Sequence, residues 1–191
     1  MLVLQILSAL LLFLNKYYVR QKKAIGWVYG ILGAIIITFY FYLQMVWQHK
    51  ANLWIMVVLD IALVILMSYG YLIAVANEGD RIKDLLKRWN VLFKSVVIIL
   101  TIFVCSLFLI EAIASNLVII QFIFAVGSMF GTLLLAFDKK VTNIFGWILY
   151  IIAHAVCTYL MFKTDSPIIA IFQILSILVA FDGINKELKK K

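Results

Sequence analysis

The sequence has few of the residues on which soluble enzymes and extracellular domains depend. Its 191 residues include one proline, two cysteines, two histidines and nine acidic residues, and only 14% are charged. Soluble domains average about 25% charged and about 45–50% apolar residues. Here 66% of the residues are hydrophobic and the mean hydropathy is +1.11. This composition excludes a secreted or cytosolic enzyme, a disulfide-stabilised scaffold and a nucleic-acid-binding protein.

The apolar residues form seven runs, and a membrane-spanning helix needs about 20 such residues. The predicted spans are 2–15, 24–46, 52–75, 90–113, 116–137, 143–162 and 165–185. The first run is short, but no basic residue precedes it and no small-residue cleavage pattern follows it, which favours a span over a signal peptide. The sequence therefore predicts an all-α integral membrane protein with seven transmembrane helices.

A charged segment, 77–89, separates the third and fourth predicted spans. Its apolar residues Ile82, Leu85, Leu86 and Trp89 recur at helical spacing. This pattern is typical of an amphipathic helix on the membrane surface. An ordinary solvated linker explains the segment equally well.

The basic residues alternate between the two sides of the predicted spans. All but three of the 17 lie in the loops after the first, third and fifth spans or at the C-terminus. The loop after the first span is assigned Lys16, Arg20, Lys22 and Lys23. Under the positive-inside rule this places the N-terminus outside and the C-terminus in the cytoplasm. The net charge of +8 thus orients the chain, and anionic lipid headgroups of the bilayer are its expected partners.

The two ends of the chain resemble each other, which predicts an internal repeat. Gly-Trp pairs lie 120 positions apart at the start of the second and sixth spans, and glycines 113 positions apart close the third and seventh spans. The related positions are Gly26-Trp27 with Gly146-Trp147, Thr38 with Thr158, Asp60 with Gln173, Gly70 with Gly183, and, 116 positions apart, Gln5 and Ala9 with Gln121 and Ala125. Two triple-helix units, 1–75 and 115–191, would then flank a surface and connector segment, 76–114. This is the 3+1+3 parallel-repeat arrangement of SWEET transporters.

Several short motifs in this order resemble the PnuC vitamin transporters over nearly the whole chain. They are Lys23-Ala-Ile-Gly-Trp-Val-Tyr-Gly30, Asp60 followed by Tyr69-Gly70, Lys139-Lys140 with Gly146-Trp147-Ile-Leu-Tyr150 and His154, and Gln173 with Asp182-Gly183. In the family's nicotinamide riboside importers, the places of Asp60, His154 and Tyr150 usually hold glutamine, asparagine and tryptophan. The resemblance thus implies a vitamin transporter whose cavity is altered, as in relatives associated with thiamine, riboflavin or nucleosides.

The resemblance also implies how such a carrier would work in the cell. It implies a bacterial inner or plasma membrane location, a homotrimer, and a cytosolic kinase that phosphorylates the vitamin and traps it. No Gly-x-x-x-x-Gly-Lys-Ser/Thr loop occurs in the sequence, which excludes ATP hydrolysis by that motif. Facilitated diffusion by alternating access follows as the expected mechanism, with no enzyme activity, cofactor or metal. Coupling to protons or sodium through Asp60 or His154 is left open.

Polar side chains within the spans predict the binding site, because such residues avoid lipid and face a cavity or a partner helix. The predicted substrate-binding residues are Asp60, Gln121, Trp147, Tyr150, His154 and Gln173. Nicotinamide riboside and thiamine both carry a positive ring that a carboxylate and aromatic faces would bind. The alternatives are helix-to-helix hydrogen bonds for Asp60, His154 and Gln173, and a SWEET-like sugar carrier or a non-transporting sensor or assembly subunit for the chain.

Overall fold

The structure is a computed structural model that describes residues 1–48, 53–76, 116–137 and 139–189. These residues form six long α-helices and no strand. The helices are α1 (Leu2–Arg20), α2 (Ile25–Gln48), α3 (Trp54–Ala76), α5 (Asn116–Ala136), α6 (Lys140–Lys163) and α7 (Pro167–Lys189). Each is long and apolar enough to cross a membrane, which confirms the all-α integral membrane class. The predicted span 90–113 and surface segment 77–89 lie outside the described residues.

Short turns with local stop signals join the neighbouring helices. After α1, Lys22 takes a left-handed backbone conformation with a φ of 59°, and its amide donates to the carbonyl of Val19 at 2.8 Å. Before α7, Asp165 has a φ of 53°, and Pro167 occupies the first helical position, where its missing N–H costs no hydrogen bond. These turns reverse the chain, so α2 runs against α1 and α7 runs against α6.

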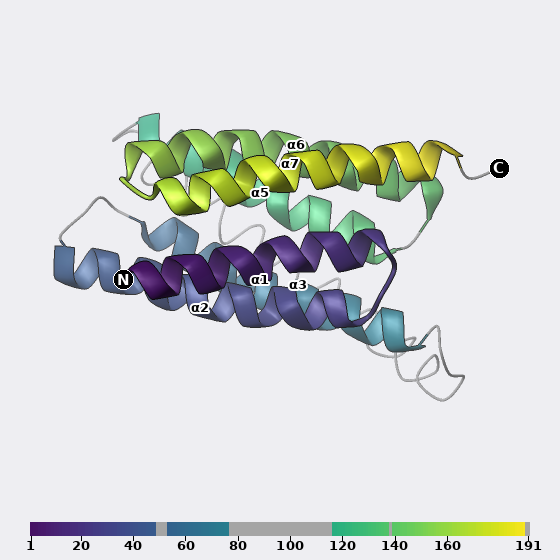
Figure 1. The fold of residues 1–191 in the computed structure, drawn as a ribbon, viewed down its shortest axis with the longest axis horizontal. Coiled ribbons are helices and arrows are strands. Elements are labelled where there is room, and N and C mark those ends of the chain that lie inside the picture. Colours follow the sequence, from purple (N-terminus) through teal and green to yellow (C-terminus); the bar gives the residue numbers. More distant parts are fainter. Residues whose placement is uncertain (49–52, 77–115, 138, 190–191) are drawn as a thin grey trace.

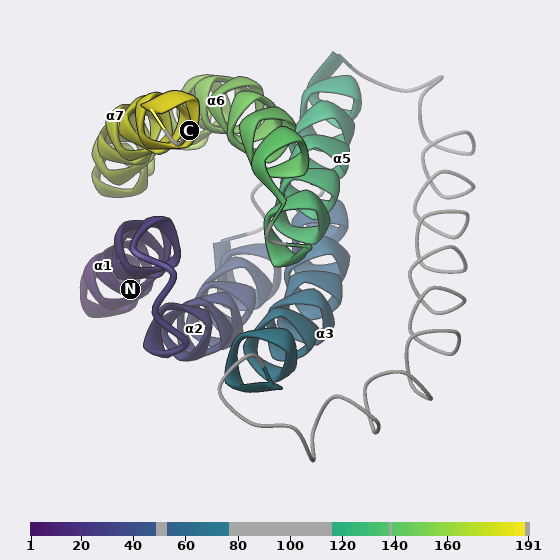
Figure 2. The same ribbon diagram turned by 90° about the vertical axis from the view of Figure 1, so that its right-hand side faces the viewer.

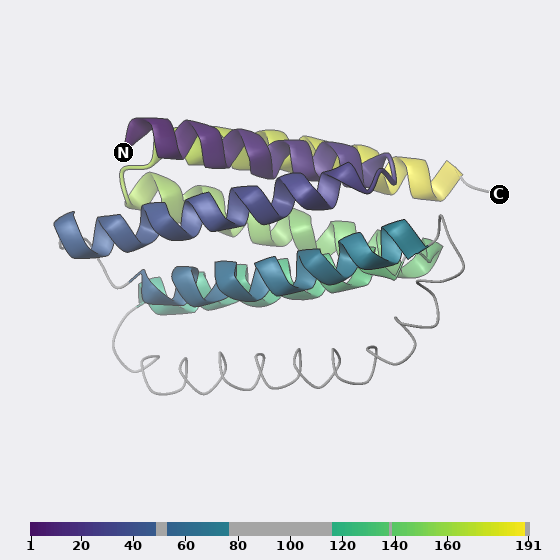
Figure 3. The same cartoon turned by 90° about the horizontal axis from the view of Figure 1, so that it is seen from below.

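The six described helices form a closed ring. Each helix contacts the next in the order α1, α2, α3, α5, α6, α7, and α7 contacts α1. Figure 2 shows this ring along the helix axes, and Figure 3 shows that α3 lies beside α5 and α1 beside α7. In Figure 1, α1, α3, α5 and α7 run in one direction, whereas α2 and α6 run in the other. The helices α1–α3 and α5–α7 therefore have the same order of directions.

The two helix triplets, α1–α3 and α5–α7, have the same packing contact between a tryptophan and a glycine. The Trp27 ring lies so close to Gly70 that an added Cβ would stand 2.7 Å from it, and the Trp147 ring leaves 2.6 Å at Gly183. These are the tryptophans and glycines that the repeat offsets relate. In each triplet, therefore, a tryptophan of the second helix packs against a glycine of the third helix.

The outer face of the ring is apolar. Large side chains such as Leu178 and Phe181 are more than half exposed, at 60% and 53%. Apolar side chains exposed over such a surface suit lipid rather than water. Basic residues gather at one end of the ring, where α1 and α7 end and α6 begins. The hydrophobic belt and the basic end agree with a ring that stands across a bilayer.

Candidate functional site

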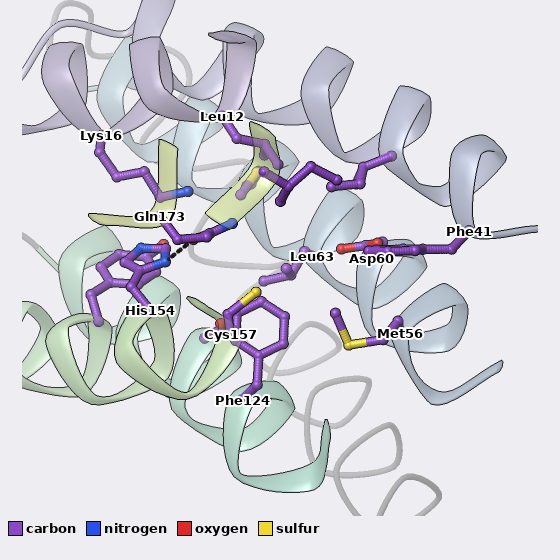
Figure 4. A pocket seen from close by; sticks show the side chains of 15 residues that line it. Leu12, Lys16, Phe41, Met56, Asp60, Leu63, Phe124, His154, Cys157 and Gln173 are labelled. Atoms are coloured by element: carbon purple, nitrogen blue, oxygen red, sulfur yellow. Dashed lines mark hydrogen bonds between the residues drawn. The ribbon is translucent and has the colours of Figure 1, made fainter. Parts of the chain in front are cut away.

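A small cavity lies inside the ring, and all six described helices contribute to its wall. Its polar lining consists of Lys16, Asp60, Ser128, Tyr150, His154 and Gln173. Leucine, isoleucine, methionine, phenylalanine and cysteine side chains complete the wall (Figure 4). The cavity volume of about 30 Å³ exceeds the roughly 10–15 Å³ that one water needs. A molecule of vitamin size would have to displace some of these side chains.

The lining draws on corresponding positions of the two triplets. Eight of its residues form four pairs that the repeat offsets of 116, 120 and 113 positions relate. The pairs are Leu12 with Ser128, Ile37 with Cys157, Met56 with Ile169, and Asp60 with Gln173. The cavity therefore lies between the triplets rather than within either one.

The α6 side of the cavity is an aromatic wall that hydrogen bonds hold in place. The ring of Tyr150 stacks on the imidazole of His154 with a centroid distance of 5.3 Å and an angle of 12°. The Tyr150 hydroxyl lies 2.6 Å from the Thr132 hydroxyl of α5. His154 Nδ1 donates to the side-chain oxygen of Gln173 on α7, which leaves Nε2 as a hydrogen-bond acceptor. A flat, fixed surface of this kind suits a planar ring.

Three buried polar atoms of the lining have no hydrogen-bond partner among the described residues. They are Asp60 Oδ2, His154 Nε2 and Ser128 Oγ. Asp60 is only 4% exposed. Buried polar groups are normally paired, and one left unpaired costs about 1–3 kcal/mol, more when it is charged. The three atoms thus provide two acceptors and a hydroxyl for a molecule held in the cavity.

Lys16 is the lining residue that the sequence interpretation misplaced. The pattern of charges places it in the basic loop, but α1 continues to Arg20, five residues beyond the predicted end of the span at residue 15. Lys16 is 5% exposed, lines the cavity, and holds its ammonium 5.7 Å from the centre of the Tyr150 ring. The available signal was its helical spacing from Ala9 and Leu12, which places it on the buried face of α1.

The predicted site residues fall in three places. Asp60, Tyr150, His154 and Gln173 line the cavity together. Gln121 is fully buried in α5 but is not part of the lining. Trp147 lies one helical turn from Tyr150, packs on Gly183 and lines a second, smaller pocket at the basic end with Arg20 and Glu187. Whether any of the six binds a substrate stays a prediction.

Long apolar helices around a buried polar cavity define the class of integral membrane proteins that can hold a solute within the bilayer. A protein-family model described as "Nicotinamide mononucleotide transporter" matches residues 2–186. The chain belongs to this family, the PnuC family, as its sequence motifs predicted. It is a family of transporters and not of enzymes. No curated protein and no solved structure matches the chain.

Proposed function

We propose that the chain carries a small cationic vitamin or vitamin precursor across the membrane, with nicotinamide riboside or thiamine as the cargo. The observation that carries this proposal is the buried Oδ2 atom of Asp60, which belongs to the cavity lining and has no hydrogen-bond partner in the part of the chain that the structure describes. A positively charged ring would supply the missing interaction, since a carboxylate in a low-dielectric site needs a counter-charge. A neutral sugar would bring no positive charge to that carboxylate.

The aromatic wall supports the same cargo class. The stacked rings of Tyr150 and His154 offer a face to a planar heterocycle. A cation over a tyrosine ring gains roughly 0.5–2 kcal/mol, and more when water is excluded. His154 Nε2 would accept a hydrogen bond from a hydroxyl group of the cargo, and the Ser128 hydroxyl could donate or accept one.

Alternating access is the proposed mechanism, and polar contacts at the two ends of α1 would supply its two closures. Where α1 begins, the Tyr40 hydroxyl accepts a hydrogen bond from the Gln5 amide and lies 2.9 Å from the hydroxyl of Ser166. At the basic end, Arg20 of α1 forms an ion pair with Asp182 of α7. Opening one closure at a time would expose the cavity to one side of the membrane and then to the other.

The proposed topology is 3+1+3, with triple-helix units 1–75 and 115–191 around the connector 76–114. The common direction of α3 and α5 supports it, because two parallel neighbours need an odd number of crossings between them. The basic end, with Lys140 and Lys186, would lie in the cytoplasm of a bacterial cell. A cytosolic vitamin kinase would then trap the cargo and sustain net uptake by facilitated diffusion.

Uptake into proteoliposomes tests this function. We expect purified protein to accelerate the entry of radiolabelled nicotinamide riboside or thiamine down its gradient, with no ion gradient or ATP. Nicotinamide mononucleotide, which the family description names, and glucose serve as comparison solutes. Faster entry of glucose alone would favour a SWEET-like carrier. No uptake of any solute under any gradient would favour a non-transporting subunit and refute the proposal.

A further inference from the structure

Two opposite charges lie in the cavity, and both come from the first triple-helix unit. Lys16 projects from α1 and Asp60 from α3, and Figure 4 shows them on opposite sides of the lining. The repeat offsets relate Lys16 to Thr132 and Asp60 to Gln173, so the second unit carries a neutral side chain at each position. The first unit thus adds a positive and a negative charge together, and their formal charges cancel.

The ammonium of Lys16 also occupies the surface that we propose for the cargo. It lies 5.7 Å from the centre of the Tyr150 ring, within the range of a cation–π contact. Two contacts hold the Tyr150 ring in place. Its hydroxyl hydrogen-bonds to Thr132, and its face stacks on His154. A positive ring that enters the cavity must therefore replace the lysine ammonium at this aromatic surface.

A cation that belongs to the protein would help a facilitated carrier in one step, the return of the empty carrier. After releasing its cargo, it must change conformation empty, and the cavity closes around Asp60 during that change. A carboxylate enclosed without any counter-charge is strongly unfavourable. A cation that belongs to the protein removes this penalty without using a proton or a sodium ion.

We propose that Lys16 is the internal counter-ion of the empty carrier, a role that rests on the proposed transport function. In the empty carrier its ammonium balances Asp60 and covers Tyr150. When a singly charged planar cation binds, the ammonium withdraws toward the basic end, because Lys16 lies about one helical turn before Arg20 and lysine has a flexible stem. The exchange of one cation for another makes the carrier suited to cargo with a single positive charge.

Comparing net uptake with exchange tests this role. Proteoliposomes that contain the wild type, Lys16→Met, Lys16→Arg or the loop control Lys23→Met are assayed with radiolabelled thiamine and nicotinamide riboside. Net entry into empty vesicles requires the carrier to return unloaded, whereas exchange against internal cargo does not. For Lys16→Met we expect net entry to fall at least about tenfold while exchange stays within about threefold of the wild type. Lys16→Arg, which keeps the charge, and Lys23→Met should retain both.

The double variant Lys16→Met/Asp60→Asn separates charge balance from damage to the fold. Removing both charges should restore the ratio of net entry to exchange, although binding is weaker. Equal loss of both rates in Lys16→Met, no loss of either, or no recovery of the ratio in the double variant would overturn the inference while leaving the transport function intact. A wild type that moves neither probe would instead overturn the proposed function, and this inference with it.

Discussion

Replacing Asp60 with asparagine is expected to weaken the binding of a cationic vitamin by about 10- to 100-fold. The change keeps the shape of the side chain and removes the charge that the cargo's positive ring would contact. Hydrogen bonds and contacts to a charged group contribute about 1.5–3 kcal/mol, and about 1.4 kcal/mol corresponds to tenfold in affinity. Isothermal titration of purified Asp60→Asn with thiamine and with nicotinamide riboside measures the effect.

A neutral ligand provides the matched control for Asp60. Nicotinamide lacks the positive charge of its riboside, so Asp60→Asn should change its binding far less. The discrimination between the charged and the neutral ligand should therefore shrink in Asp60→Asn and persist in Asp60→Glu. If charged and neutral ligands weaken equally, Asp60 supports the fold of α3 and does not bind the cargo's charge.

Gly183→Ala is expected to destabilise the protein by about 1–2 kcal/mol, although alanine is the better helix former. Helix propensity alone would stabilise the variant by about 0.8–1 kcal/mol. The added Cβ would however stand 2.6 Å from the buried Trp147 ring, and overpacking of that kind costs about 1–3 kcal/mol or more. The midpoint temperature of thermal unfolding in detergent shows whether the variant is less or more stable than the wild type, and we expect it to fall. Gly70→Ala should behave alike, because its Cβ would meet Trp27 at 2.7 Å.

Two further variants separate this contact from a general effect of alanine. Gly127→Ala places its Cβ 3.1 Å from the Cβ of Ala153, a milder approach, and should lower the midpoint less. Combining Gly183→Ala with Trp147→Phe makes room for the new methyl group, so the double variant should lose less stability than the sum of the two single changes. A raised midpoint in Gly183→Ala would show that the indole does not rest on this backbone.

The membrane spans could be predicted from the sequence because lipid offers the backbone no hydrogen-bond partners. Each backbone polar group must be satisfied within the segment, so long apolar runs become helices. Hydropathy does not mark where such a helix stops. The helix α1 continues through Lys16 to Arg20, since basic residues are good helix formers and their long side chains reach the interface or a cavity. Hydropathy alone therefore places Lys16 in a loop.

The sequence predicts part of the candidate site, because polar residues in apolar spans mark it. Asp60, His154 and Gln173 stand out because polar residues are rare in apolar spans, and the structure brings them to one cavity. Trp147 shares a helix face with Tyr150 but lies one turn nearer the basic end, where it meets Gly183 instead of the cavity. Periodicity identifies the face of a helix and does not say which layer of that face borders a void.

Alkylation of Cys157 tests whether the cavity opens to water and holds the cargo, because this thiol lines the cavity and is buried. The other cysteine of the sequence, Cys105, is replaced by alanine so that only Cys157 can react. In this Cys105→Ala background, N-ethylmaleimide should label Cys157 only when water reaches the cavity, since the thiolate is the reactive form. We expect slow labelling that thiamine or nicotinamide riboside suppresses in this background, and much weaker suppression when Asp60→Asn is added to it. Labelling at the same rate with and without each vitamin would contradict a cavity that opens to water and holds the cargo.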